Sequence, residues 1–231
     1  MYSYIALGYF MNNKKVLLTV FMAVAGFFAC KKDGEKVAAI TYNQITIINA
    51  GGDTLNVYEN GTRVNNGSNL LPSGQYRNLK VVAGTQRYQF KKAGSPNTLF
   101  EHELSLDDST LYTMFVAGRT GDQVFLLQVD TLPTDTAAHV RFVNASPDAG
   151  NIDFTIGNLP TVKAQPFKSA TSFLSVAPGP VFYSMYIEGQ STPVASGTLT
   201  LNKSTSYNLF LKGTVDGKGT NALGARLLIV K

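Results

Sequence analysis

Cysteine, histidine and charge are all scarce in this sequence. Cys30 is the only cysteine among 231 residues, so neither a disulfide framework nor a cysteine metal site can be built. Charged residues make up 15%, and the formal net charge of +5 falls to +3 if Lys14 and Lys15 leave with a signal segment. Because no basic stripe with interleaved aromatic residues appears either, we expect no nucleic-acid partner.

Few residues could supply catalysis. Only His102 and His139 could act as imidazole bases, and no Gly-x-Ser-x-Gly motif accompanies them. We predict surface roles for both, His139 at the start of a strand and His102 on an exposed segment. Residues 217–220 (GKGT) superficially resemble a phosphate-binding loop, but Gly219 replaces Ser or Thr and an upstream glycine is absent. We therefore predict a loop there, no cofactor and no enzyme.

The N-terminal segment has the marks of an export signal. Residues 12–15 (NNKK) are polar and basic, residues 16–29 are mostly apolar, and the small residue Ala29 precedes Cys30. A membrane-spanning helix needs about 20 apolar residues, more than this run offers. Because residues 1–10 carry no charge, we predict that Met11 is the true start.

Cleavage after Ala29 would make Cys30 the N-terminal residue. Acyl chains on its thiol and amine would hold the protein at a membrane; a buried free cysteine in a hydrophobic helix is the alternative. Residues 31–36 (KKDGEK) are similar to the charged tags of Bacteroidetes surface lipoproteins, and a solvated tether explains them equally well. We predict a lipid-anchored cell-envelope protein at the outer membrane, and leave open whether it faces the periplasm or the cell surface.

The chain repeats itself at a constant offset of 95 residues, since 140 minus 45 is 95. The aligned pairs are residues 45–50 with 140–145, Asp53 with Asp148, residues 81–84 with 176–179, and residues 109–112 with 204–207. A period this long indicates duplicated domains, because solenoid units run about 20 to 50 residues.

Each copy shows the pattern of an all-β domain. Short runs of β-branched and aromatic residues alternate with polar ones between Gly, Asn, Asp and Pro, and no helical period follows the signal. Tyr112, Met114 and Val116 share one face. About seven strands per copy, spaced by roughly 8 to 12 residues, predict two tandem immunoglobulin/transthyretin-like antiparallel β-sandwiches.

The pattern divides the chain into five parts. They are a signal segment at 1–29, a tether at 30–42, a divergent first sandwich at 43–130, a linker at 131–138 and a second sandwich at 139–231. Because the linker is short, we expect the sandwiches to lie end to end.

Residues 140–154 (VRFVNASPDAGNIDF) resemble the signature of the domain of unknown function 4397 family of exported bacterial proteins. The resemblance continues through residues 175–179 and 201–207 and so covers the second copy well. In the first copy Gly51-Gly52 stands in place of Ser146-Pro147, which makes it a divergent relative. The resemblance implies a β-sandwich and an exported location, and it supplies no activity and no catalytic residues.

The motif supplies the candidate loop, which is either a turn or a ligand site. Its residues are Asn144, Ser146, Pro147, Asp148, Asn151 and Asp153. Pro147 fixes its φ, and Asp148 and Asn151 can bond nearby amides, which favours a turn. With Asp153 they also place three oxygen-bearing side chains within six residues, a weak calcium motif. We predict no metal.

Phe115 and Phe210 occupy the faces opposite Tyr112 and Tyr207. If these faces were open, the rings would form a sticky or sugar-stacking patch, but burial on both faces is the favoured alternative. The sequence also holds four patterns that resemble Bacteroidetes O-glycosylation acceptors or ordinary Asp-Thr turns. They begin at Asp53, Asp108, Asp130 and Asp135.

These observations predict a non-catalytic, lipid-anchored envelope protein whose sandwiches bind a partner or act as a spacer. A glycan-binding accessory lipoprotein is the alternative, and an envelope hydrolase is a less favoured one. The predicted partners are the membrane, through acyl chains on Cys30, and a glycan or an envelope protein.

Overall fold

The computed structural model of this chain describes residues 41–129 and 131–230. Cys30, the signal segment and most of the tether lie outside these residues, so what we predict for them stays a prediction. The described residues belong to one compact unit. Within them, no helix has the length and apolar character that crossing a membrane requires.

Each copy of the repeat contributes eight strands to the described residues. The first copy has β1 (Tyr42–Asn49), β2 (Leu55–Glu59), β3 (Thr62–Arg63), β4 (Gln75–Val82), β5 (Gly84–Lys92), β6 (Thr98–Leu106), β7 (Leu111–Val116), the 3-10 turn η2 (Gly121–Gln123) and β8 (Val124–Gln128). The second copy has β9 (Ala138–Asn144), β10 (Ile152–Ile156), β11 (Val162–Gln165), β12 (Leu174–Val176), β13 (Gly179–Ile187), β14 (Ala195–Leu201), β15 (Thr205–Lys212), the 3-10 turn η3 (Gly219–Asn221) and β16 (Gly224–Ile229). We predicted about seven strands per copy; β3, with two residues, is too short to show an alternation.

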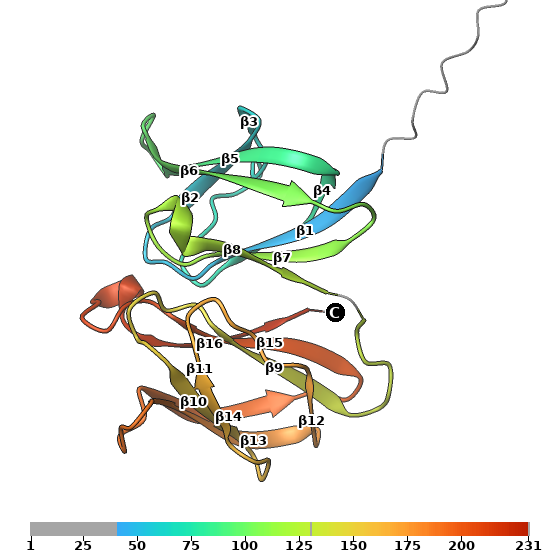
Figure 1. The fold of residues 1–231 in the computed structure, drawn as a ribbon, viewed down its shortest axis with the longest axis vertical. Coiled ribbons are helices and arrows are strands. Elements are labelled where there is room, and N and C mark those ends of the chain that lie inside the picture. The colour runs from blue at the N-terminus through green and yellow to red at the C-terminus, as the bar shows by residue number, and fades with distance from the viewer. Residues whose placement is uncertain (1–40, 130, 231) are drawn as a thin grey trace, which may run out of the picture. The chain divides into compact units, whose positions relative to one another are not determined.

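Each copy is a sandwich of two four-stranded sheets (Figure 1). The first copy has the orders β4-β1-β7-β8 and β3-β2-β5-β6, and the second has β12-β9-β15-β16 and β11-β10-β13-β14. Adding eight to each strand number of the first copy gives the second, so the topology is duplicated along with the sequence. The named strand pairs are antiparallel except β1–β7 and β9–β15, which are parallel. The predicted all-β fold of two tandem sandwiches is confirmed.

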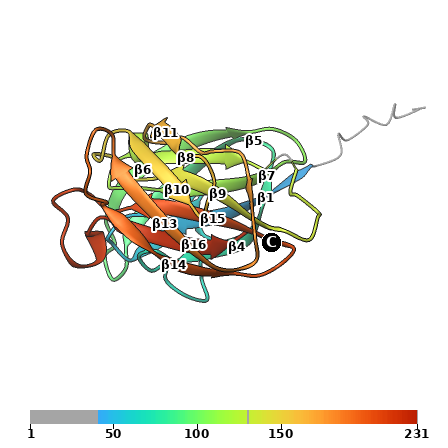
Figure 2. The same ribbon diagram turned by 90° about the horizontal axis from the view of Figure 1, so that it is seen from below.

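We call the sheets that contain β1 and β9 the inner sheets and the other two the outer sheets. Figure 2 shows the outer strands β10, β13 and β14 in front of the inner strands β9, β15 and β16. Side-chain alternation fills the space between the two sheets: on β10, Ile152 and Phe154 are buried, whereas Asp153 and Thr155 are half-buried on the opposite face. Phe154 stacks on Phe142 of β9 with ring centroids 4.8 Å apart.

A tyrosine closes the same corner in each copy. The hydroxyl of Tyr112 accepts the main-chain N–H of Asp107 at 3.0 Å, and the hydroxyl of Tyr207 accepts that of Asn202 at 2.9 Å. Met114 and Val116 join Tyr112 in the core of the first copy, as the shared face predicts. The ring therefore fills the core while its polar end satisfies a backbone donor at the turn.

The central strands of the inner sheets, β7 in the first copy and β9 and β15 in the second, are buried on both faces over most of their length. One face closes its own sandwich, and the other contributes to an apolar cluster that joins the two copies. Its fully or nearly fully buried members are Ile48, Ala50, Phe115, Ala117, Phe125, Val143, Ala145 and Phe210. The prediction of sandwiches set end to end is therefore wrong. Facing the inner sheets toward each other removes two apolar surfaces from water, which stabilises by about 25 cal/mol for each Å² buried.

Equivalent residues meet at this interface between the copies. Phe115 and Phe210 make an edge-to-face contact with ring centroids 5.5 Å apart. Contact between two copies of one position is the mark of a two-fold, self-complementary interface, here formed within a single chain. The main-chain N–H of Gly213 donates to the carbonyl of Ala50 at 3.1 Å, which adds a polar connection beside the cluster.

Candidate functional site

Asn144 ends β9 and organises the loop of the family motif. Its Nδ2 donates to the carbonyls of Gly150 at 2.9 Å and Gln165 at 3.0 Å, and its Oδ1 accepts the main-chain N–H of Ser146 at 3.2 Å. The side chain is fully buried. Its polar atoms are thus occupied by loop backbone that would otherwise lack partners.

Asn49 does the same in the first copy. Its Nδ2 donates to the carbonyls of Asp53 at 2.7 Å and Leu70 at 3.2 Å, and its Oδ1 accepts the main-chain N–H of Gly51 at 3.1 Å. The second bond spans 21 residues in both copies. The divergent first copy therefore keeps the loop architecture although it lacks the Ser-Pro pair.

Ser146 and Asp148 fasten the motif loop to the loop that follows β15. The buried Ser146 hydroxyl donates to the carbonyl of Gly213 at 2.8 Å, and Oδ1 of Asp148 accepts the main-chain N–H of Val215 at 3.1 Å. Pro147 lies at the edge of the cleft described below.

Asn151 and Asp153 have partners of their own. Nδ2 of Asn151 donates to Glu188 at 2.9 Å, and Asp153 accepts from Nζ of Lys163 at 2.7 Å and from the main-chain N–H of Ala164 at 2.9 Å. The hydrogen bond from Lys163, with that from Ala164, lowers the pKa of Asp153. Within residues 41–129 and 131–230 no group of three or more His, Cys, Asp or Glu side chains could hold a metal ion.

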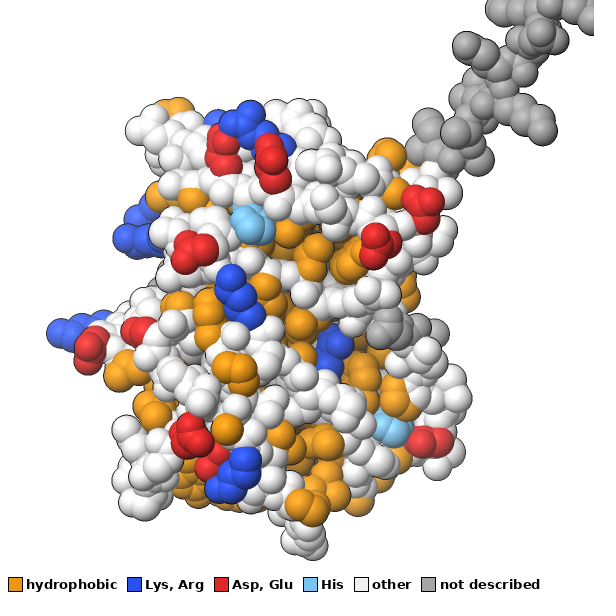
Figure 3. All heavy atoms as spheres, in the orientation of Figure 1, with side chains coloured by type: hydrophobic (Ala, Val, Ile, Leu, Met, Phe, Trp, Pro, Cys, Tyr) orange, Lys and Arg blue, Asp and Glu red, His pale blue; other side chains and the backbone are white. Residues whose placement is uncertain are grey.

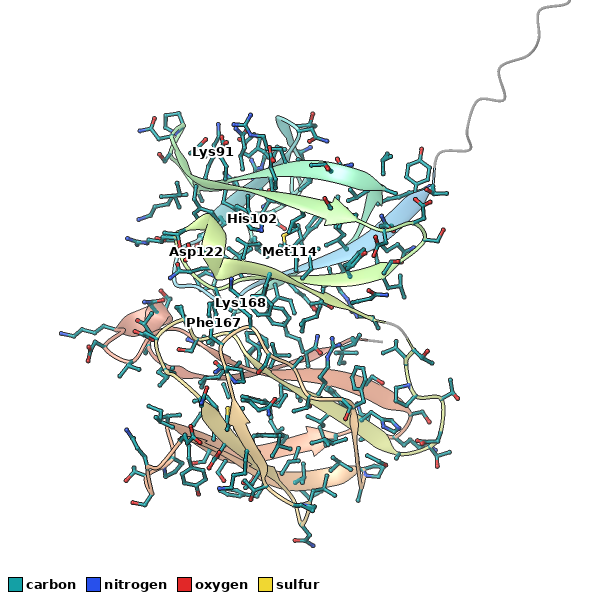
Figure 4. All side chains as sticks on the ribbon, viewed as in Figure 1. Lys91, His102, Met114, Asp122, Phe167 and Lys168 are labelled. Carbon is teal, nitrogen blue, oxygen red and sulfur yellow. The ribbon has the colours of Figure 1, made fainter. Side chains whose placement is uncertain are left out.

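The two histidines lie in different surroundings. The surface role predicted for His139 is wrong: the residue is 4% exposed, because β9 is buried on both faces, and its Nε2 lies 2.7 Å from Oδ1 of Asp135. His102 is half-buried, and burial together with the nearby Lys168 ammonium lowers its pKa. Figure 4 shows Lys168 close to Asp122 and His102, beside the interface between the copies.

The open aromatic patch considered for Phe115 and Phe210 does not exist. Both side chains are 0% exposed, and each is covered by the other copy. The favoured prediction of burial on both faces holds, but its cause is the second sandwich. A sugar ring cannot stack on either residue in this structure.

The candidate site is a cleft of about 950 Å³ between loops of the two copies. Its walls come from the ends of β2 and β5 and the segments that follow β1, β5 and β7 of the first copy, and from the segments that follow β9 and β15 of the second. The volume lies at the upper end of the range usual for small-ligand sites, about 300 to 1,000 Å³. On the molecular face in Figure 3 acidic and basic side chains are interspersed, whereas the cleft gathers basic ones.

Asp53 organises the charges of the cleft. Nε and Nη2 of Arg119 donate to its two oxygens at 2.6 and 3.1 Å, and Nζ of Lys92 lies 3.6 Å from Oδ1. The Asp53 side chain is 13% exposed, whereas those of Arg119 and Lys92 are 71% and 58% exposed. The carboxylate is thus sheltered, and the two cations reach solvent.

The loop after β15 forms the opposite wall. The Thr220 hydroxyl donates to the carbonyl of Gly52 at 2.8 Å. A Cβ on Gly52 would lie 2.6 Å from that of Asn221, so only glycine permits this approach. The loop of residues 217–220, predicted to lie between the last two strands, therefore belongs to the cleft.

The sequence predicted neither Arg119 nor Lys92 as a site residue. The two residues are 27 positions apart in the sequence, and what brings them together is their shared ion pairing with Asp53, in the copy that departs from the family motif. The sequence did contain one sign of a cleft at this position. Gly51-Gly52 stands where the second copy has Ser146-Pro147, so the first copy lacks those side chains in its loop.

Comparison with known proteins identifies the family. The sequence model described as Domain of unknown function (DUF4397) matches residues 43–155 and 138–227, which together exceed half of the chain. No curated protein matches the sequence.

Solved structures give only distant likenesses. A family 41 carbohydrate-binding module that recognises α-glucan, from streptococcal virulence factors, is 11% identical over 73% of this chain and 92% of its own, with a TM-score of 0.26. A family 26 module from Eubacterium rectale Amy13K, solved with maltoheptaose, is 10% identical over 81% and 96%, with a TM-score of 0.25. A proposed cell adhesion protein from Bacteroides eggerthii is 9% identical over 82% and 95%, with a TM-score of 0.22. At such TM-scores none of them bears on what this chain binds.

Proposed function

Since this chain belongs to the DUF4397 family, whose description assigns no function, we propose a function from its own residues: a non-catalytic binding protein of the cell envelope. In this proposal acyl chains on Cys30 anchor the protein, and the paired sandwiches present the cleft between them to a ligand. The cleft is the observation that carries the proposal.

Three features of the cleft favour binding. It is large enough for a ligand, and its walls come from both copies. The side chains of Arg119 and Lys92 pair with Asp53 but remain mostly exposed to solvent, where a ligand can reach them. The apolar cluster and the bond from Thr220 to Gly52 hold the walls against each other. A site held in place before binding loses little conformational entropy when the ligand arrives.

The anchor rests on the sequence alone. Polar and basic residues 12–15, the apolar run to Ala29 and Cys30 directly after it are the features of a lipoprotein signal. Two or more acyl chains give stable anchoring, whereas a single chain binds a membrane only marginally. The outer membrane is the proposed location, with the sandwiches on either the periplasmic or the outer side.

Glycan binding is the second candidate, but without the aromatic platform that open faces at Phe115 and Phe210 would have supplied. Phe115 and Phe210 are buried between the copies. The polar and charged groups of the cleft would have to recognise the sugar instead.

The proposed anchoring is tested by mass spectrometry of the mature N-terminus together with proteolysis of intact cells. We expect acylated Cys30 in the wild type, and loss of membrane association in Cys30→Ala. Cleavage on intact cells would locate the sandwiches on the surface, and protection would locate them in the periplasm. An unmodified Cys30 in the membrane fraction would overturn the anchor.

A further inference from the structure

We propose that the cleft binds an anionic saccharide, with Arg119, Lys92 and Lys218 as the groups that recognise its carboxylate or sulfate. This rests on the proposed function, because it takes the cleft as the binding site, and it adds the chemical class of the ligand.

The charge of the lining is the first reason. Among the described residues that line the cleft, the charged ones are Lys92, Arg119 and Lys218 and the carboxylate of Asp53. Asp53 engages two nitrogens of Arg119, and most of that side chain remains exposed to solvent. A guanidinium carries five N–H donors in a planar fork, so it can hold Asp53 and still present donors to a second anion.

The position of the cations is the second reason. Arg119 and Lys92 belong to the first copy, whereas the exposed Lys218 belongs to the loop after β15 of the second. A ligand between the walls therefore meets positive charge from both sides. Because the walls lower the local dielectric, these interactions are stronger than on a flat surface.

The uncharged lining favours a polyhydroxylated ligand. Hydroxyl and amide side chains of Thr54, Thr214, Thr220, Gln123 and Asn221 line the cleft, and within residues 41–129 and 131–230 no aromatic residue does. Such groups both donate and accept hydrogen bonds, as sugar hydroxyls do. The lining thus suits a sugar whose ring is bonded at its edges and whose charge is met by the cations.

An acidic peptide suits the cleft less well. Extended peptides usually add to an exposed sheet edge, where free main-chain groups pair with them. Here the main-chain N–H groups of Ala50 and Gly51 already donate to Val116, and that of Gly213 donates to Ala50. These three donors beside the cleft are therefore already engaged and cannot pair with a peptide backbone.

Calorimetric titration of the detergent-solubilised full-length protein at low salt tests the proposal. The probes are tetragalacturonate, which carries only carboxylates, a κ-carrageenan tetrasaccharide, which carries only sulfates, maltotetraose, tetraglutamate and sodium sulfate. We expect at least one anionic saccharide to bind at least tenfold more tightly than the other classes. The first two probes separate a carboxylated ligand from a sulfated one.

Variants then locate the binding. Arg119→Gln should weaken binding about tenfold, the loss expected for one charge-assisted hydrogen-bonded contact. Asp53→Asn should strengthen it several-fold, because the carboxylate that competes with the ligand for Arg119 and Lys92 is removed. Lys163→Gln is the matched control, since Lys163 also pairs with a 13%-exposed aspartate but lies outside the cleft, and it should leave affinity unchanged.

Several outcomes overturn the proposal. They are equal binding of maltotetraose, equal binding of sulfate alone, preference for tetraglutamate, no binding by either anionic saccharide, and an Arg119→Gln effect no larger than that of Lys163→Gln. Binding of maltotetraose or tetraglutamate that Asn221→Ala weakens would retain the cleft as a site and reject only the ligand class. Acylation of Cys30 is measured by mass spectrometry, so its outcome is independent of this titration.

Discussion

The two copies differ most where the loop after their first strand meets the loop after their seventh. In the first copy Asp53 contacts the exposed guanidinium of Arg119. In the second, Asp148, 95 residues further on, accepts the main-chain N–H of Val215. The first aspartate thus holds an exposed cation at the cleft, and its equivalent fastens two loops to each other. Equivalent positions of a duplicated framework can therefore make different contacts.

The framework around these loops is nearly the same in both copies. Asn49 and Asn144 each make three bonds to loop backbone, and Tyr112 and Tyr207 each accept one main-chain N–H across five residues. Substituting both members of such a pair tests whether equivalent residues contribute equally to the free energy of unfolding.

The interface between the copies should give the largest effect. Phe115→Ala and Phe210→Ala should each lower the free energy of unfolding by about 4 kcal/mol, because each removes a fully buried ring. Since the rings touch, the double variant should lose less than the sum of the two. Guanidinium denaturation followed by circular dichroism measures all three.

Phe182→Ala is the control for the interface, because that ring is 59% exposed on an outer sheet and should cost under about 0.5 kcal/mol. Strict additivity of the Phe115 and Phe210 effects would contradict direct contact between the copies.

The loop asparagines should come next. Asn49→Ala and Asn144→Ala each remove three hydrogen bonds to loop backbone, so each should cost about 3 kcal/mol. Similar losses would show that the divergent first copy depends on its asparagine as much as the second. The exposed Asn97→Ala serves as control in the same denaturation series. A loss confined to Asn144→Ala would mean that the two loops are equivalent in shape only.

The corner tyrosines should contribute less. Tyr112→Phe and Tyr207→Phe each remove one hydrogen bond and keep the ring, which should cost about 1 kcal/mol. Hydrogen exchange at the amides of Asp107 and Asn202 should accelerate in the matching variant alone. Tyr42→Phe, at an exposed ring, is the control. Unchanged exchange at both amides would contradict the hydroxyl as their acceptor.

The smallest expected difference between the copies is in how their stability depends on pH in acid. Asp153 has a lowered pKa, and the equivalent residue of the first copy is Asn56. The equivalence follows from the strand pairing: Asp153 pairs with Tyr186 of β13 and Asn56 pairs with Lys91 of β5, and 186 minus 91 is 95. A lowered carboxyl pKa adds stability above the unfolded value of about 3.9, and that stability is lost as pH falls through the folded value. Asp153→Asn should therefore flatten the stability profile below about pH 4. Parallel profiles for the wild type and the variant would contradict the role of Lys163.

Much of the fold was readable from the sequence because its signals are local. Alternation placed Tyr112, Met114 and Val116 on one face, and the 95-residue offset anticipated a duplicated sheet topology. The environment of His139 was not readable, because burial depends on what covers a strand and not on the strand itself. The same limit applied to Phe115 and Phe210, for which two alternatives remained until the second sandwich was seen to cover them.

The sequence by itself determined that this protein is two copies of one β-sandwich, because period-two alternation and internal repetition are properties of the chain. It also carries the predicted lipoprotein signal at Cys30. Only the tertiary structure decided that the inner sheets bury each other and that Lys92, Arg119 and Lys218 surround one cleft. Those residues lie on separate segments of the chain, which converge only after the strands have paired and the apolar faces of the inner sheets have packed together.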